Sequence, residues 1–180
     1  MKLFILFFML FNAFLYAESK MYFGVGYSNI MEEFDDIDAQ SSSDTLEVKF
    51  GYGLREAYAI ELIAYNTQNE SNIFSSNDGD KLGVDIELVK AFDLNTFIYP
   101  FFKAGFGAGY MEVDREIQDK LNYGSFNFGV GSFIAISENF DFELGYKYKN
   151  ISYEAIEMVS EVIEYKSASS TAYLGINARF

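Results

Sequence analysis

The amino-acid sequence predicts an all-β protein, an eight-stranded antiparallel up-and-down transmembrane β-barrel. Three observations predict this fold: an apolar leader at the start of the chain, eight later segments in which large apolar residues alternate with small or polar ones, and connections that alternate between short and longer. In barrels of the bacterial outer membrane, short turns face the periplasm and long loops face the outside. We expect the same arrangement here.

The leader has the features of an export signal. Lys2 gives a short positive start, the run from Leu3 to Phe11 is entirely apolar, and Ala17 is a small residue suited to the last position before cleavage. An uncleaved anchor helix is the alternative, but about 15 mainly apolar residues are short for a helical span of roughly 20. We therefore expect a signal peptide over 1–17 and an outer-membrane β-barrel domain over 18–180.

Eight segments of the remaining chain repeat with a period of two, which is the period of side chains along a strand. In the second, the sequence Leu46-Glu-Val-Lys-Phe-Gly-Tyr-Gly53 separates each large apolar residue from the next by one polar or small residue. The same pattern predicts a strand in each of the eight. These segments are 21–28, 46–53, 58–64, 81–88, 102–110, 126–131, 140–149 and 172–180.

The connections between these segments fall into two classes. Those after the second, fourth and sixth segments are tight, at 54–56, 92–95 and 137–139. Those after the first, third, fifth and seventh are longer and polar. This asymmetry is typical of an outer-membrane barrel with periplasmic turns and extracellular loops. An even number of up-and-down strands also brings both chain ends to the periplasmic end.

The two faces of the segments differ in a way that favours a membrane barrel over a soluble sandwich or a soluble ligand-binding barrel. In lipid the outward face must be apolar, because the closed ladder satisfies the backbone groups internally. The polar face here is rich in glycine and carries charges of both signs, which suits the narrow interior of eight strands. Since a lone buried charge costs several kcal/mol, we expect these charges to pair in the lumen. The expected lumen charge network comprises Glu47, Lys49, Glu61, Asp85, Glu87, Lys103, Glu143, Lys147, Lys149 and Arg179.

The apolar face carries large aromatic residues near the strand ends. Two groups of them are expected to form the aromatic girdles that anchor a barrel at the two membrane interfaces. The group toward the turns is Tyr52, Tyr58, Phe102, Phe140 and Phe180, and the group toward the loops is Tyr27, Tyr110, Phe126 and Tyr148.

Three segments resemble strands of the OmpA/OmpX-type family of small outer-membrane β-barrels. They are Tyr58-Ala-Ile-Glu-Leu-Ile-Ala-Tyr65, Tyr99-Pro-Phe-Phe-Lys-Ala-Gly-Phe-Gly-Ala-Gly-Tyr110 and Phe140-Asp-Phe-Glu-Leu-Gly-Tyr-Lys-Tyr148. The resemblance covers the whole chain after the leader and implies a location in the cell outer membrane. It implies architecture more than function, because members of this fold do many things. The chain ends with the barrel, so we expect no peptidoglycan-binding domain.

The C-terminal segment resembles the signal that the barrel-assembly machinery reads in this family. A terminal Phe180 follows alternating apolar positions, and Tyr173, Leu174 and Ile176 complete the pattern. The resemblance implies that the machinery and periplasmic chaperones are partners during biogenesis. In the membrane, the expected partners are outer-membrane lipids and lipopolysaccharide.

Composition removes several classes of function. The chain has no histidine and no cysteine, so Ser–His and Cys–His catalytic pairs and Cys-based metal or redox sites are absent from the sequence. No motif suggests another activated nucleophile, and we expect no catalytic residue, no metal site and no cofactor. The formal net charge of −14 argues against nucleic acid as a partner, because phosphate binding requires clustered lysine and arginine.

Most of the acidic residues lie in the four longer connections. Taken as 30–44, 67–80, 111–121 and 150–168, they hold 17 acidic residues and three basic ones. The first forms an acidic loop with Glu32, Glu33, Asp35, Asp36 and Asp38. Several carboxylates attract divalent cations, but the spacing of an EF-hand is missing, so a solvated acidic loop is the preferred interpretation. Such a rim would contact lipopolysaccharide phosphates through bridging cations, or attract a basic surface.

The last connection, 152–170, has a mixed pattern. Ile156, Val159 and Ile163 suit one face of a helix. The alternating set Val159, Glu161, Ile163 and Tyr165 also fits a strand. We favour extended strands that rise above the membrane. By family resemblance, such a hairpin would bind a partner by edge pairing, and the alternative is a plain loop that covers the barrel mouth.

Two functions remain. The first is a structural or surface-interaction role through the acidic loops, in envelope integrity or adhesion. The second is a narrow channel for ions or small solutes. The interior distinguishes them, because inward Phe133 and Tyr173 together with lysines and glutamates predict a filled lumen in so small a barrel. The sequence favours the first function and leaves the extracellular ligand open.

Overall fold

The computed structural model describes residues 20–34, 40–68, 78–114, 119–157, 162–163 and 165–180. The expected signal peptide, 1–17, lies outside the described residues, as do Asp35, Asp36 and Asp38 of the expected acidic loop. Within the described ranges, no helix is long and apolar enough to cross a membrane.

Eight antiparallel strands close into a barrel in which each strand pairs with its neighbour in the chain and the last strand pairs with the first. Around the barrel the order is β1-β10-β7-β6-β5-β4-β3-β2, and β8 pairs with β9 in a separate hairpin. The predicted eight-stranded up-and-down barrel is therefore confirmed. The barrel strands are β1 (Lys20–Phe34), β2 (Gln40–Gly53), β3 (Tyr58–Gln68), β4 (Lys81–Ala91), β5 (Ile98–Glu112), β6 (Lys120–Ala135), β7 (Phe140–Tyr153) and β10 (Lys166–Arg179).

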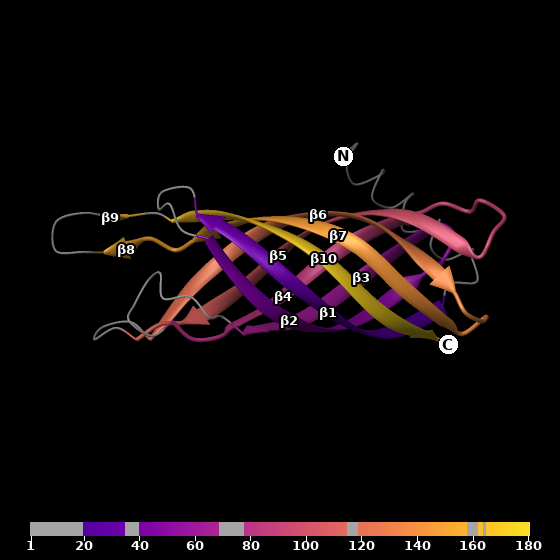
Figure 1. Ribbon diagram of the computed structural model, residues 1–180, viewed down its shortest axis with the longest axis horizontal. Helices are drawn as coiled ribbons and strands as arrows, with labels where there is room; N and C mark the ends of the chain where they lie inside the picture. Colours follow the sequence, from indigo (N-terminus) through magenta and orange to yellow (C-terminus); the bar gives the residue numbers. More distant parts are fainter. Residues whose placement is uncertain (1–19, 35–39, 69–77, 115–118, 158–161, 164) are drawn as a thin grey trace, which may run out of the picture.

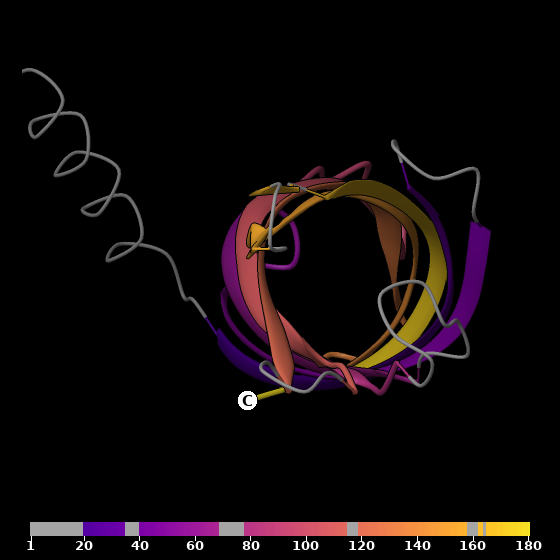
Figure 2. The same ribbon diagram turned by 90° about the vertical axis from the view of Figure 1, so that its left-hand side faces the viewer.

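The two ends of the barrel differ. At one end, here called the turn end, the connections 54–57, 92–97 and 136–139 join neighbouring strands and the C-terminus lies nearby (Figure 1). The opposite end, the loop end, carries β8 (Ile156–Glu157) and β9 (Val162–Ile163), which extend beyond the barrel wall (Figure 1). Figure 2, seen from the loop end, shows the strands as a closed ring.

The strands extend further toward the loop end than the sequence pattern predicts, and this corrects the expected loops. β1 runs to Phe34 and β2 begins at Gln40, with Glu33 opposite Gln40, so only 35–39 separate them. The outward positions of β1 are apolar as far as Tyr27 and mixed beyond it, with polar Asn29 and Glu33 on either side of Met31, while the backbone pairing continues. A strand needs about 9–11 residues to cross the membrane, so the longest barrel strands, such as β1 with 15 residues and β6 with 16, leave several to protrude.

The last connection is extended where the structure describes it. Ile156 pairs with Ile163 and Glu157 with Val162, in an antiparallel hairpin. This agrees with the strand alternative for 152–170 and excludes a helix at those four residues.

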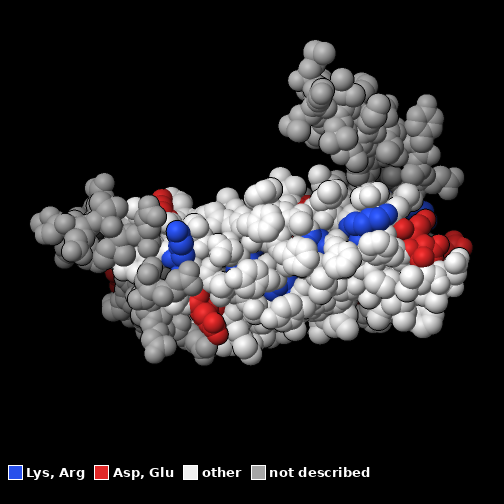
Figure 3. Space-filling model, turned by 90° about the horizontal axis from the view of Figure 1, so that it is seen from above, with Lys and Arg blue, Asp and Glu red and all other residues white. Residues whose placement is uncertain are grey.

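Side chains alternate between the two faces of the wall along every barrel strand. In β3 each exposed residue is followed by a buried one, from Tyr58 to Gln68. Large apolar side chains such as Phe106 and Leu144 point outward, and charged ones such as Glu61 point inward. Figure 3 shows acidic residues near the two ends of the barrel, with a mainly uncharged surface between them. This is the apolar outer band that lipid requires.

Candidate functional site in the barrel interior

A cluster of charged side chains crosses the middle of the lumen. Glu143 of β7 accepts one hydrogen bond from the Nζ of Lys49 and one from the Nζ of Lys103, each at 2.7 Å. The Nζ of Lys103 also lies 2.5 Å from a carboxylate oxygen of Glu61. Tyr22 donates to Glu61 at 2.6 Å. These side chains come from β1, β2, β3, β5 and β7, so the cluster, here called the central bridge, joins opposite walls.

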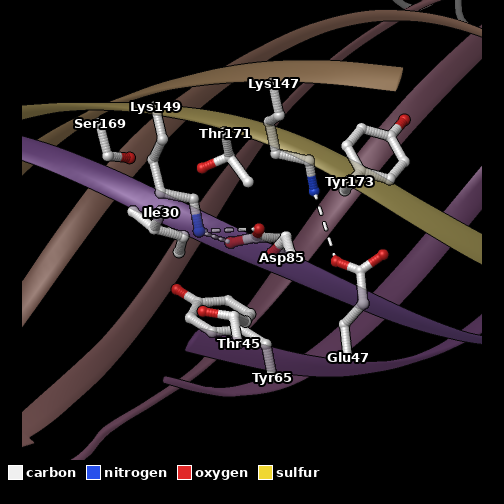
Figure 4. Close-up of a pocket in the computed structure, with 11 residues that line it drawn as sticks. Ile30, Thr45, Glu47, Tyr65, Asp85, Lys147, Lys149, Ser169, Thr171 and Tyr173 are labelled. Atoms are coloured by element: carbon white, nitrogen blue, oxygen red, sulfur yellow. Dashed lines mark hydrogen bonds and ion pairs between the residues drawn. The ribbon is translucent and has the colours of Figure 1, made fainter. Parts of the chain in front are cut away.

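A second charged layer lies on the loop side of the central bridge. Lys149 contacts both carboxylate oxygens of Asp85, at 2.9 and 3.0 Å. Lys147 pairs with Glu87 at 2.9 Å. It also approaches Glu47 at 4.0 Å, and Figure 4 shows this contact beside the Lys149–Asp85 pair. All of these groups except Glu87 border a cavity of about 30 Å³, which the small hydroxyl residues Ser28, Thr45, Ser169 and Thr171 also line. At roughly 10–15 Å³ for each water centre, the cavity has room for about two water molecules.

A third group of charges closes the turn end. Arg179 donates to Asp141, and the Nε of Arg55 lies 2.7 Å from the other oxygen of the same carboxylate. Arg55 also donates to the backbone carbonyl oxygens of Ser137 and Glu138, at 2.9 and 3.0 Å. An apolar cluster fills the lumen next to the central bridge. Its members are Tyr22, Ala59, Val89, Ala91, Phe101, Phe133 and Tyr173, with Tyr99 packed against them.

The loop end is filled as well, and here one expectation is wrong. Glu32, predicted in a solvated acidic loop, lies inside β1, is 5% exposed and pairs with Lys81. It also accepts hydrogen bonds from Tyr153 at 2.8 Å and Ser167 at 2.6 Å. β1 continues past the apolar pattern, and its side chains still alternate between the two faces of the wall. Glu32 therefore points inward and Glu33 lies on the outside of β1. Around them lies an apolar cluster of Phe34, Met111, Val113, Leu121, Tyr123, Ile151 and Tyr153.

Within the part of the chain that the structure describes, the ion pairs of the interior are balanced in charge. Their seven acids are Glu32, Glu47, Glu61, Asp85, Glu87, Asp141 and Glu143, and their seven bases are Lys49, Arg55, Lys81, Lys103, Lys147, Lys149 and Arg179. The net charge of −14 therefore lies entirely outside this network. Such a balance fits a closed interior, because unpaired buried charge is costly.

Inward glycines make room for the largest side chains of the lumen. A Cβ atom at Gly145 would lie 2.5 Å from the hydroxyl of Tyr173, and one at Gly131 would lie 2.6 Å from the ring of Phe101. Both approaches are closer than real Cβ contacts. The ring of Phe101 also packs on Phe133, with ring centroids 4.6 Å apart. The glycine-rich segments of the sequence thus allow the interior to be filled.

The structure brings the sequence-predicted lumen residues together in separate groups. Lys49, Lys103, Glu61 and Glu143 meet in the central bridge, with Glu47 3.5 Å from Lys49. Asp85, Glu87, Lys147 and Lys149 form the second layer, and Arg179 lies at the turn end. Sequence reasoning missed Asp141, Arg55, Glu32 and Lys81 as members of the ion-pair network. Asp141 shares the inward phase of Glu143, which is the signal that would have found it.

The residues of the expected assembly signal lie on both faces of β10. Leu174, Ile176 and Phe180 are exposed outward, by 58%, 45% and 75%, whereas Tyr173 points into the lumen and is buried. The backbone N–H of Phe180 donates to the carbonyl oxygen of Met21 at 2.9 Å, which continues the pairing of β10 with β1. Recognition of these residues by the assembly machinery stays a prediction.

Comparisons with known proteins agree on the architecture. The sequence model of the family described as outer membrane protein beta-barrel domain matches residues 3–180. The fold is similar to that of Neisserial surface protein A (NspA), with 14% identity, a TM-score of 0.72, and coverage of 91% of this chain and 100% of that one. It is also similar to Ail, the attachment invasion locus protein of Yersinia pestis, with 17% identity, a TM-score of 0.56, and coverage of 91% and 100%.

A third similar structure is the outer membrane protein OprG from Pseudomonas aeruginosa, with 15% identity, a TM-score of 0.55, and coverage of 91% of this chain and 96% of that one. A search of curated protein sequences found no match. At these identities the structural likeness concerns the fold alone. Among the described residues, no group of three or more acidic side chains is arranged to hold a metal ion.

Proposed function

The chain belongs to the outer membrane protein beta-barrel domain family, and on this premise we propose that it is a barrel with a closed lumen that acts through its loop end. Its location is the cell outer membrane. Its role, in this proposal, is structural or surface-interacting, in envelope integrity or adhesion. It carries no solute through the membrane.

The observation that carries the proposal is the filled interior. An ion that entered from the loop end would meet the Lys81–Glu32 pair, then the layer around Lys147, then the central bridge, and last the Arg179–Asp141 pair. Breaking one buried pair by removing a partner costs roughly 3–5 kcal/mol, and each of these layers would have to open. Apolar clusters fill the space around the outermost layers.

The charge outside the lumen supports the choice of the loop end as the acting surface. The interior network is neutral, and the acids that remain are concentrated in the sequence of the longer connections. Exposed carboxylates of the described part of this end include Glu112 and Asp119. A surface of one sign attracts a partner of the opposite sign and raises its rate of association. The names of two similar structures, a surface protein and an attachment invasion locus protein, fit the same role.

A narrow channel is the second candidate, and the cavity beside Lys147 favours it. This cavity is lined by hydroxyl groups that would accept water or a small ion. It holds only about 30 Å³, however, and the central bridge lies on its turn side. A pore would need these charged groups to separate.

Binding of a basic polypeptide tests the surface role. Proteoliposomes that display the loop end should bind poly-lysine, and binding should fall as salt shortens the Debye length from about 10 Å at 0.1 M to about 3 Å at 1 M. The triple variant Asp80→Asn, Glu112→Gln, Asp119→Asn should bind several-fold less. The control is Glu56→Gln, Asp93→Asn, Glu138→Gln, which removes three acids at the turn end. Equal binding by both triple variants would contradict the proposal.

A further inference from the structure

The outer face of the barrel is hollowed across β2 to β5, toward the loop end. The groove has a volume of about 520 Å³, within the range of about 300–1,000 Å³ typical of small-molecule sites. Its floor is formed by Ala64, Val84 and Ala108, and its loop-side wall is the register row Leu46, Asn66, Leu82 and Tyr110, which is apolar except for Asn66. These floor and wall side chains point outward, on the face opposite to the lumen.

The strand register explains why the groove exists. Ala64 lies opposite Val84, and Val84 lies opposite Ala108, so small side chains form a continuous row across three strands. On the turn side, the next outward row holds Leu62, Ile86 and Phe106, and Phe106 is 71% exposed. Large residues therefore flank a row of small ones. The row continues to Gly124, which lies opposite Ala108 on β6 and adds no side chain.

The loop-side wall ends near a positive charge. The Nζ of Lys120, an exposed residue at the start of β6, lies 4.3 Å from the ring centroid of Tyr110. Because the loop end of an outer-membrane barrel faces the outside, this part of the wall contacts the outer leaflet. The ammonium group of Lys120 could bind the phosphate of a lipid at this end of the groove, while an acyl chain of the same lipid lies in the apolar part.

We propose that the groove binds one acyl chain of a phosphorylated lipid of the outer leaflet, the class to which the lipid A part of lipopolysaccharide belongs, with a phosphate beside Lys120. Lipid is the medium that touches this face. Lipid tails are as apolar as the groove, so apolarity alone cannot favour one lipid over another. Selectivity for one lipid comes from van der Waals fit and from the positive charge of Lys120 at the loop-side end of the groove. Glu112, the register partner of Lys120, opposes the phosphate.

Titration with lipid A, read by native mass spectrometry of the folded full-length protein released from micelles, tests the groove. Ala108→Leu fills the floor and should lower the one-lipid-bound fraction by about threefold or more. The matched control is Ala104→Leu, on the same strand four residues toward the turn end and also exposed, which should bind as the unaltered protein does. Ala64→Leu on β3 repeats the test should Ala108→Leu fail to fold. Equal binding by floor and control variants would overturn the proposal.

The positive charge of Lys120, at the loop-side end of the groove, is tested separately. Lys120→Ala should lower binding of lipid A and leave binding of uncharged diacylglycerol unchanged, whereas Glu112→Gln should raise binding of lipid A. Lys90→Ala is the control, because Lys90 stands 4.1 Å from the ring of Tyr58 at the turn end and makes the same kind of contact there. Equal loss in the two lysine variants, or equal binding of phosphatidylglycerol and lipid A, would contradict the assignment to outer-leaflet lipid.

Discussion

At the scale of single residues, Glu143 illustrates what local pattern can and cannot predict. The period of β7 places it in the lumen, and a buried carboxylate there requires positive partners. Its partner Lys49 lies 94 positions away in the sequence and nearer to Glu143 than to Glu47, at 2.7 against 3.5 Å. Closure of the barrel brings β2 and β7 face to face across the lumen. The sequence therefore predicts which charges lie inside, and only the closed ring determines how they pair.

Two leucines test the assignment of faces at the same scale. Leu144 lies within β7 and Leu94 in the β4–β5 turn, and their exposures are nearly equal, 58% and 57%. Leu144→Arg should lower the free energy of unfolding in a bilayer by about 2–4 kcal/mol, because the arginine would enter the hydrocarbon. Leu94→Arg should change it by about 0–1 kcal/mol near the interface. Denaturant titration in liposomes measures both, and a Leu144 variant as stable as the Leu94 variant would mean that the outer face is not in lipid.

At the scale of elements, the strands were predicted in number, order and facing, but not in length. The apolar alternation of β1 ends near Asn29, yet its pairing with β2 continues to Glu33. Sequence pattern detects the part of a strand that lies in lipid, because only there must the outward positions be apolar. Above the bilayer the backbone hydrogen bonds persist without that signal. The polar sequence around Glu32 therefore predicts a loop, although this residue lies in a strand.

The terminal strand β10 carries a prediction of its own. The resemblance of the C-terminal segment to an assembly signal predicts that Phe180→Ala reduces assembly in cells several-fold while the yield of refolding in detergent stays unchanged, because the exposed ring would be read during insertion and would contribute little to packing. Phe140→Ala is the matched control, since Phe140 is an outward aromatic residue that begins the neighbouring strand β7. A heat-dependent gel shift measures folded protein in both settings. Equal losses in cells and in detergent would identify Phe180 as an ordinary packing residue.

At the scale of the whole molecule, charge is divided between a neutral interior and an acidic exterior. Seven acids and seven bases pair inside the barrel, so the net charge of −14 belongs to the surface and the connections. This division accounts for two features at once. In the proposed function, the paired interior closes the lumen, and the remaining acids give the loop end a negative charge that a partner of opposite sign can recognise.

Conductance across a planar bilayer tests the closed lumen most directly. A variant with Lys49, Lys103, Glu61 and Glu143 all replaced by alanine removes the central bridge without changing the net charge, and it should also produce no current steps, because the other charged layers and both apolar clusters remain in place. The unaltered protein, shown to be folded by its gel shift, should produce none, because the central bridge and the layers on either side of it block the path. Reproducible current steps through the folded, unaltered protein would contradict the account.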